Sequence, residues 1–509
     1  MNTHRHRFLG RPFIIALAVL SLLLPGISQA QVRGDQQGKQ TNIHIPGLLE
    51  IKFREGSQIR LRDGKPTDLN GKALQSPAAQ AALMIKGIWS RSHDTSEANL
   101  DLMKAEGDRE NLKNNIAEAL PNLNLYLRFQ LADVGATDSA FDQLQKVPEI
   151  EAVYRVPAPI APPIAPDYYN ANLGNPIQPY QAYQDAAPLG VGSRFIDDYL
   201  TYPGSRGTAM RICDVEYSWN RSHSDLGTTT LLGASPIDPF ANTNHGTAVL
   251  GVYGGTSNGF GVTGIAYRAG KYLSAANTSA GYNVAAAITR CSNGILNGDV
   301  IVIEQQIAGP NYVAANAPSQ FGLVPAEWYK PTYDAIKTAT ANKRIVVEAA
   351  GNGSQNLDSL TYSTGNGDHW PFTAARDSGA IIVGAGQSYL FNIWSIGSPH
   401  SFSNTGLTVD LQGWGDNVVT SGYGDVYSVE GSNAWYTNFA GTSAATPIVA
   451  GAVASVQGLY KQYHPAGQTL TASSVKSVLR TTGTPQGSGA TIGPLPNIPA
   501  ALDKTKTLP

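Results

Sequence analysis

The sequence predicts an α/β protein with a doubly wound, mainly parallel sheet, preceded by a small α+β segment. Two observations support this fold class. From residue 209 onwards, short apolar runs alternate with helical runs, which is typical of a parallel sheet covered by helices on both faces. A proline-rich stretch at 157–166 separates this region from an upstream part with a different pattern. The chain has 509 residues, which is enough for more than one domain.

The upstream part predicts a compact α+β module. Two strand-like runs, 49–53 and 125–131, flank a polar, charged region that we expect to be partly helical. A short helix with one apolar face follows at 138–147, and a last strand at 150–154 leads into the prolines. The stretch of prolines is expected to be extended and to act as a linker.

The downstream part carries the alternation of strands and helices. Expected strands are 209–213, 300–303, 344–348 and 380–383, and expected helices are 245–253, 284–296, 333–341 and 447–460. In open parallel sheets, functional side chains lie beyond the C-terminal ends of the strands. Asp214 and Asn352 each come just after an expected strand, so we expect both at that edge.

The N-terminus is typical of a secretory signal at residues 1–30. Three arginines precede an apolar core at 13–24, and small residues follow at 28–30. The core is shorter than the ~20 residues that span a bilayer, which disfavours an uncleaved anchor. We therefore expect a secreted protein, extracellular or periplasmic, with no membrane association after signal cleavage. The net charge of -2 argues against a nucleic-acid partner.

Cys213 and Cys291 are the only cysteines. They are too few for a disulfide-built scaffold, and their spacing from histidines gives no zinc motif. They could form one bridge in an oxidising compartment, or both could be buried as small apolar side chains. Because Cys213 lies on an expected core strand, we favour free thiols.

Ser443 lies in the segment NFAGTSAATP, at the expected start of an Ala- and Val-rich helix. Free backbone N–H groups at a helix N-terminus can stabilise negative charge. A serine hydroxyl is a weak nucleophile and needs a histidine base with an acidic partner, for which His245 and Asp214 are candidates. The alternative is a buried helix whose small residues only allow close packing.

Read in order, Asp214, His245, Asn352 and Ser443 lie in ICDVEYSWN, NHGTAV, AAGNG and GTSAATP. These segments resemble the subtilisin-like serine peptidases, over roughly residues 180–501. Segments at 264–266, 383–385, 402–406 and 409–411 are also similar to that family. The order Asp, His, Ser is the one known for subtilisin.

The resemblance implies a role for each residue. Ser443 attacks the peptide carbonyl, His245 takes and returns the proton, and Asp214 holds the imidazole tautomer. The Asn352 amide and the Ser443 backbone N–H bind the oxyanion. The resemblance further implies substrate-binding positions at Gln305, Gln306, Ala350 and Gly351.

The sequence departs from the family at two places. Glu216 stands two residues after the expected acid, where the family usually has a small residue, and Glu304-Gln305-Gln306 replaces Ser-Leu-Gly on a substrate-lining strand. The larger side chains either narrow the cleft or point outward and leave the backbone free to pair with a substrate. A second histidine, His223, is expected to be structural.

We therefore predict a secreted serine endopeptidase made as a zymogen. Residues 1–30 are the signal, 31–166 an inhibitory prosegment with its linker, and 167–509 the peptidase domain, with linker cleavage between 156 and 170. The expected partners are protein or peptide substrates and the chain's own prosegment. No metal ligands and no certain cofactor are expected, although the resemblance makes calcium possible. The alternatives are a processing peptidase with few substrates and a non-catalytic binding relative.

Overall fold

The computed structural model describes residues 43–72, 74–162, 174–175, 178–314, 319–364, 371–429, 431–464 and 467–509. The expected signal and residues 163–170 of the expected linker cleavage region lie outside these ranges. Among the described helices, none has both the length and the apolar character needed to cross a membrane.

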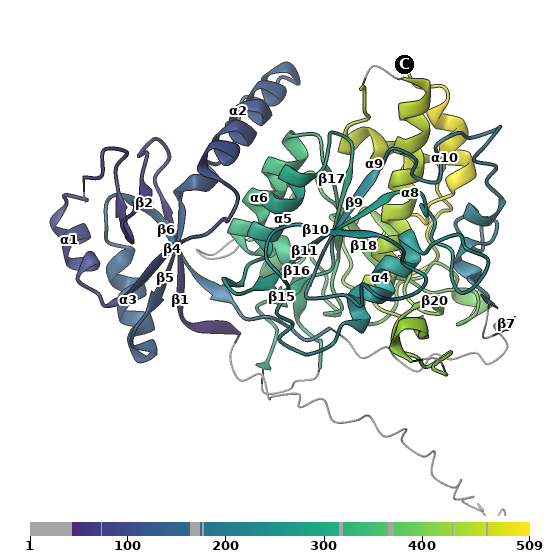
Figure 1. The fold of residues 1–509 in the computed structure, drawn as a ribbon, viewed down its shortest axis with the longest axis horizontal. Coiled ribbons are helices and arrows are strands. Elements are labelled where there is room, and N and C mark those ends of the chain that lie inside the picture. Colours follow the sequence, from purple (N-terminus) through teal and green to yellow (C-terminus); the bar gives the residue numbers. More distant parts are fainter. Residues whose placement is uncertain are drawn as a thin grey trace, which may run out of the picture. The chain divides into compact units, whose positions relative to one another are not determined.

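Seven parallel strands form the central sheet and confirm the predicted fold class (Figure 1). Their order across the sheet is β10 (Thr229–Leu231), β11 (Gly270–Ala275), β9 (Arg211–Glu216), β14 (Val300–Ile303), β17 (Ile345–Ala349), β18 (Ile381–Gly386) and β19 (Leu411–Trp414). All neighbouring pairs are parallel. Strand β9 comes first of these in the chain but lies inside the sheet, so the connections run outward in both directions from it.

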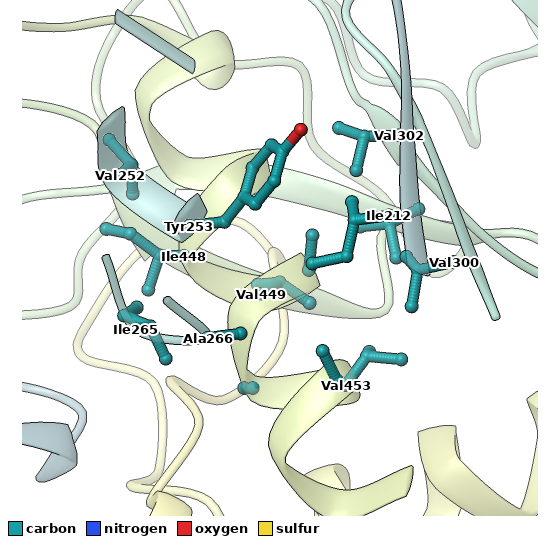
Figure 2. Packing of buried hydrophobic residues seen from close by; sticks show 14 of the residues in the cluster. Ile212, Val252, Tyr253, Ile265, Ala266, Val300, Val302, Ile448, Val449 and Val453 are labelled. Carbon is teal, nitrogen blue, oxygen red and sulfur yellow. The ribbon is translucent and has the colours of Figure 1, made fainter. Parts of the chain in front are cut away.

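Helices cover both faces of the sheet. On one face, Ile212, Val300 and Val302 pack with apolar residues of α4 (Asn244–Gly254) and α8 (Thr442–Tyr463), as Figure 2 shows. The opposite face packs against α5 (Val284–Gly294) and α6 (Lys330–Ala341). Because successive side chains of a strand alternate between faces, the even-numbered residues of β9 and β14 point to α4 and α8.

The cysteines form a disulfide, which corrects the expectation of free thiols. Cys213 of β9 is bonded to Cys291 of α5 on the face opposite Ile212. Both side chains are fully buried, as expected for a core strand, but the helix that packs on this face brings the second sulfur to the first.

The upstream module has both helices and strands, as predicted, and its strands form a four-stranded antiparallel sheet. Its order is β4 (Gly87–Arg91), β5 (Tyr126–Leu131), β1 (His44–Phe53) and β6 (Ile150–Pro157). Apolar residues of β1, β5 and β6 pack on α3 (Thr137–Leu144) and α1 (Pro77–Leu83), and α2 (Glu97–Lys113) lies in the polar region. Strand β4 was not expected from the sequence.

Shorter elements complete the described chain. They are β2 (Arg60–Arg62), β3 (Lys65–Thr67), β7 (Gly174–Asn175), β8 (Gln178–Pro179), β12 (Asn277–Thr278), β13 (Gly281–Tyr282), β15 (Gln306–Ala308), β16 (Leu323–Pro325), β20 (Val418–Ser421), β21 (Tyr436–Phe439), α7 (Leu360–Ser363), α9 (Ala472–Thr482) and α10 (Ile498–Thr505).

Candidate active site

Ser443 is the second residue of α8 and is 4 % exposed. Gly441 precedes the helix with φ +104°, a conformation that glycine adopts without strain, and this lets the chain turn from β21 into α8. The backbone N–H of Thr442 donates to Asn352 Oδ1 at 2.9 Å. The hydroxyl of Ser443 therefore lies at a capped helix N-terminus.

His245 is the second residue of α4, and its position is fixed by close packing at Gly246, by the Phe439 ring and by the Glu216 carboxylate. Its neighbour Gly246 lies so close to the chain that a Cβ there would be 2.4 Å from the Ser218 carbonyl oxygen. The imidazole ring packs edge-on against Phe439 at 5.4 Å between centroids, and Nδ1 is hydrogen-bonded to the Glu216 carboxylate. His245 Nε2 has no partner among the described residues.

Glu216 uses both oxygens of its carboxylate. Oε1 contacts His245, while Oε2 accepts from the backbone N–H of Tyr217 at 3.0 Å and from Gln305 Nε2 at 3.4 Å. The side chain is 2 % exposed. These donors leave the carboxylate fixed with one oxygen aimed at the imidazole.

Asp214 does not contact His245, which departs from the expected pairing. Its Oδ2 accepts from Trp219 Nε1 at 2.8 Å, and Oδ1 has no partner among the described residues. Burial, and next the charge of Glu216, raise the pKa of Asp214 well above its usual range. Strand β9 extends to Glu216, three residues beyond the expected end, so Asp214 lies within the sheet and Glu216 lies at its edge.

The sequence signal for Glu216 is its spacing from Asp214, although the choice between the two acids depends on where β9 ends. Asp214 and Glu216 are two residues apart, and therefore point to the same face of the sheet. The C-terminal end of the strand is where a site is expected, and the later of the two acids meets that condition better.

Asn352 lies beside the start of α8, as expected for an oxyanion donor. Its Oδ1 accepts from Thr442, so Nδ2 is left as the free end of the amide, and in this structure Nδ2 donates to Gln320 Oε1 at 3.0 Å. Gln320 Nε2 in turn donates to the carbonyl oxygen of Ala161 at 3.2 Å. The donor group of the Asn352 amide is thus occupied by Gln320 in this structure.

The other expected binding residues are buried within the protein's own hydrogen bonds. Gln305 contacts Glu216, and Gln306 Oε1 accepts from the Asn352 backbone N–H at 2.9 Å. The carbonyl oxygens of Ala350 and Gly351 accept from Asn404, at 2.7 and 3.0 Å. Neither glutamine side chain points outward, since Gln305 is 2 % and Gln306 is 8 % exposed.

A cavity of about 10 Å³ brings the candidate groups together, a volume close to that of one water molecule. It is lined by Ile160, Pro162, Glu216, Tyr217, His245, Glu304, Gln305, Gln306 and Ser443. Two of these residues belong to the linker that follows β6. The hydroxyl of Tyr217 also holds Ile160, accepting from its N–H and donating to its carbonyl, both at 3.0 Å.

His223 lies elsewhere and has a structural role in the fold. Its Nε2 is 2.9 Å from the carbonyl oxygen of Trp435, and Nδ1 accepts from the Asp225 backbone N–H at 3.2 Å. Within the described ranges, no group of three or more His, Cys, Asp or Glu side chains is arranged to hold a metal ion.

Comparison with known proteins relates this chain to a peptidase family. A model of the subtilase family of peptidases, S8, matches residues 222–493. The match begins after both Asp214 and Glu216, so it does not choose between the two acids. Subtilisin DY of Bacillus licheniformis is 28 % identical over 308 residues, which is 60 % of this chain and 94 % of the relative. Subtilisin E of Bacillus subtilis is 26 % identical over 325 residues, 63 % of this chain and 72 % of the relative.

Two solved structures share the fold over most of the chain. The epidermin leader peptide processing serine protease of Staphylococcus aureus has a TM-score of 0.53 at 15 % identity and covers 91 % of this chain and 99 % of its own. Fervidolysin of Fervidobacterium pennivorans, a keratinolytic enzyme, has a TM-score of 0.52 at 18 % identity, covering 89 % of this chain and 64 % of its own.

Proposed function

Since the chain belongs to the subtilase family and is a serine-type endopeptidase, we propose that it cleaves peptide bonds with a triad of Ser443, His245 and Glu216. The observation that carries this proposal is the contact of His245 Nδ1 with the Glu216 carboxylate, beside a cavity that Ser443 also lines. Glu216 replaces Asp214, the acid expected from the sequence.

The proposed reaction proceeds through an acyl-enzyme. Ser443 Oγ attacks the peptide carbonyl carbon while His245 Nε2 takes its proton. The imidazolium then gives that proton to the leaving amine, and water repeats the sequence to release the acid product. Glu216 accepts the Nδ1–H bond, which keeps the proton-accepting tautomer in place and stabilises the imidazolium.

The oxyanion would be held by two donors at the start of α8. These are Asn352 Nδ2 and the backbone N–H of Ser443, which has no earlier helical turn to donate to. The bond from Thr442 N–H to Asn352 Oδ1 fixes which end of the amide faces the substrate. Gln320 Oε1 occupies Nδ2 here and would have to give way to the oxyanion.

The test of this function is covalent labelling with a fluorophosphonate, followed by digestion of a mixed peptide library. Wild-type protein is expected to label and to cleave, and Ser443→Ala to do neither. Ser455→Ala is the matched control, because Ser455 is buried in the same helix and its hydroxyl only donates to the Gly451 carbonyl. A folded Ser443→Ala protein that still cleaves, or a wild type that never labels, as a non-catalytic binding relative would behave, contradicts the proposal.

We further propose that residues 31–166 are a prosegment that inhibits the peptidase. Its sheet contacts the α5 and α6 side of the peptidase region: Tyr126 hydroxyl donates to Asp334 at 2.5 Å, and Arg128 donates to the Tyr282 carbonyl at 2.7 Å. All four side chains are buried. The linker then passes the cavity at Ile160 and Pro162, where it would exclude a substrate.

Secretion is part of the same proposal. The pattern of residues 1–30 supports export, and the bond between Cys213 and Cys291 fits an oxidising compartment. With the signal removed, we expect neither a membrane nor a nucleic acid as a partner. The calcium suggested by the resemblance has no assigned ligands.

A dedicated processing peptidase is the second candidate. Gln306 is the observation that favours it, because its side chain bonds both the Asn352 backbone and Gln320 and so fills part of the cleft. A structural relative is named for processing a leader peptide. The peptide library separates the two candidates, since a few cuts within one motif indicate processing and many cuts indicate general digestion.

A further inference from the structure

Glu304 carries a third carboxyl group next to the candidate triad. In the register of the neighbouring parallel strands, Val302 of β14 lies beside Asp214 and Ile303 beside Val215. The next step places Glu304 beside Glu216, and its backbone N–H donates to Val215 O at 3.4 Å. Neighbouring strands are about 4.8 Å apart, so the two side chains leave the sheet side by side on the same face.

The carboxyl group of Glu304 is buried without compensation. The residue is 5 % exposed, and neither side-chain oxygen has a hydrogen-bond partner among the described residues. Glu216, by contrast, has three donors for its two oxygens. An ionised carboxylate without donors or a cation is costly to bury, so the neutral acid is the stable form at this position.

The carboxyl groups that face Glu304 increase this preference for the neutral form. Strand β9 presents Glu216 and Asp214, α4 presents His245 and Tyr253, and α8 presents the hydroxyl of Ser443. Burial, followed by the charges of Glu216 and Asp214, raises the pKa of Glu304 well above its usual range, and only the Ser443 hydroxyl acts in the opposite direction.

A neutral carboxyl is a hydrogen-bond donor, and the position of Glu304 gives that donor a use. Glu304 and Ser443 line the same cavity of about 10 Å³ together with His245 and Glu216. The cavity has room for about one water, so the acid lies within direct or one-water reach of the serine oxygen. An ionised Glu304 would instead put a second negative charge beside the developing oxyanion.

We infer that Glu304 is a further catalytic carboxyl of this peptidase, which works in its neutral form by donating a hydrogen bond at Ser443 Oγ, and whose ionisation ends activity at high pH. The Glu304 proton is not consumed: the serine proton still passes to His245 and on to the leaving amine. This inference rests on the proposed role of Ser443 as nucleophile.

The test compares pH profiles of kcat/KM for the full chain after maturation, in wild type, Glu304→Gln and Glu327→Gln. The amide of Glu304→Gln is a permanently neutral donor. We expect this substitution to lower kcat/KM at acidic pH by up to about tenfold, which is less than the loss of a general acid or base. The pH at which kcat/KM falls on the alkaline side of the profile should rise by at least about one unit. Glu327 is the matched control, being a buried acid that lies outside the cavity, with a pKa that burial raises to about 7.

Several outcomes would overturn the inference. One is an alkaline limb at the same pH in wild type and Glu304→Gln; another is a wild type that stays fully active at high pH. A folded Glu304→Gln protein that is labelled by fluorophosphonate yet inactive at every pH would show that the ionised form is needed instead. If the wild type itself is not labelled, the proposed role of Ser443 as nucleophile is wrong, and the role of Glu304 is lost with it.

A second measurement does not depend on turnover. The infrared difference spectrum between wild type and Glu304→Gln, recorded at a pH where wild type is active, is expected to contain the C=O band of a protonated carboxyl. Its absence contradicts the inference.

Discussion

Replacing Glu216 by glutamine is expected to lower turnover far more than replacing Asp214 by asparagine. The hydrogen bonds of Glu216 give the reason. Oε2 accepts from the Tyr217 backbone N–H and from Gln305. In Glu216→Gln, the amide oxygen is expected to take the place of Oε2, because both of these neighbours are hydrogen-bond donors. The amide NH₂ then points at His245 Nδ1, which must become an acceptor, so the ring proton moves to Nε2.

That tautomer cannot take the serine proton. In a serine protease of another fold, the corresponding acid-to-amide change lowers kcat about 10⁴-fold, and we expect roughly 10³- to 10⁴-fold for Glu216→Gln. Asp214→Asn keeps the acceptor for Trp219 Nε1. Because burial favours the neutral form of Asp214, the amide is close to a like-for-like replacement, and its effect on kcat should be small.

The assay is steady-state cleavage of a peptide substrate by both matured variants, with thermal unfolding measured in parallel to correct for loss of folded protein. KM is expected to change little in Glu216→Gln, since the acid does not touch the substrate. The reasoning is refuted if Asp214→Asn costs as much turnover as Glu216→Gln, or if Glu216→Gln retains wild-type turnover.

Three further predictions concern other parts of the molecule. Asn352→Ala should lower kcat with little change in KM, by about 100- to 1,000-fold if the loss of the corresponding donor in a subtilisin is a guide; unchanged kcat with raised KM contradicts the role. Replacing Cys213 and Cys291 together by serine should lower the free energy of unfolding by roughly 4 kcal/mol, from the 78-residue separation, and denaturant unfolding with no loss of stability would contradict this. Burial and neighbouring arginines lower the pKa of His93 from 6.5 to about 3, so the unfolded or released form takes up a proton first as pH falls below 6.5. Stability of the full chain should therefore decline between pH 6.5 and 3, by up to roughly 5 kcal/mol, and His93→Gln should flatten this dependence in pH-dependent unfolding; identical curves would contradict it.

The sheet could be predicted because its strands are short apolar runs with helices between them. The expected strand at 300–303 coincides with β14, and helix α5 begins at the expected residue, Val284. Strand β4 was missed because its sequence, GIWSR, is short and partly polar. Its place in the module is decided by antiparallel pairing with β5, a contact between distant residues that no local pattern contains.

The sequence motifs of the candidate site could be predicted, but the contacts between its side chains could not. Ser443, His245 and Asn352 could be put forward as site residues because helix starts and glycine-flanked turns leave local signals, and their roles stay predictions. The choice between Asp214 and Glu216 depends on where β9 ends, and strand ends are poorly determined by local sequence. The inward orientation of Gln305 likewise depends on a carboxylate on the neighbouring strand.

The disulfide has a consequence for the accuracy of the site. Cys213 and Glu216 are on the same strand and face opposite sides of it, so a slip of β9 by one residue would exchange the two sides and turn the acid away from His245. The bond to Cys291 forbids that slip, since it holds one side of β9 to α5 covalently. We therefore expect the bond, once formed, to favour the register in which Glu216 faces His245.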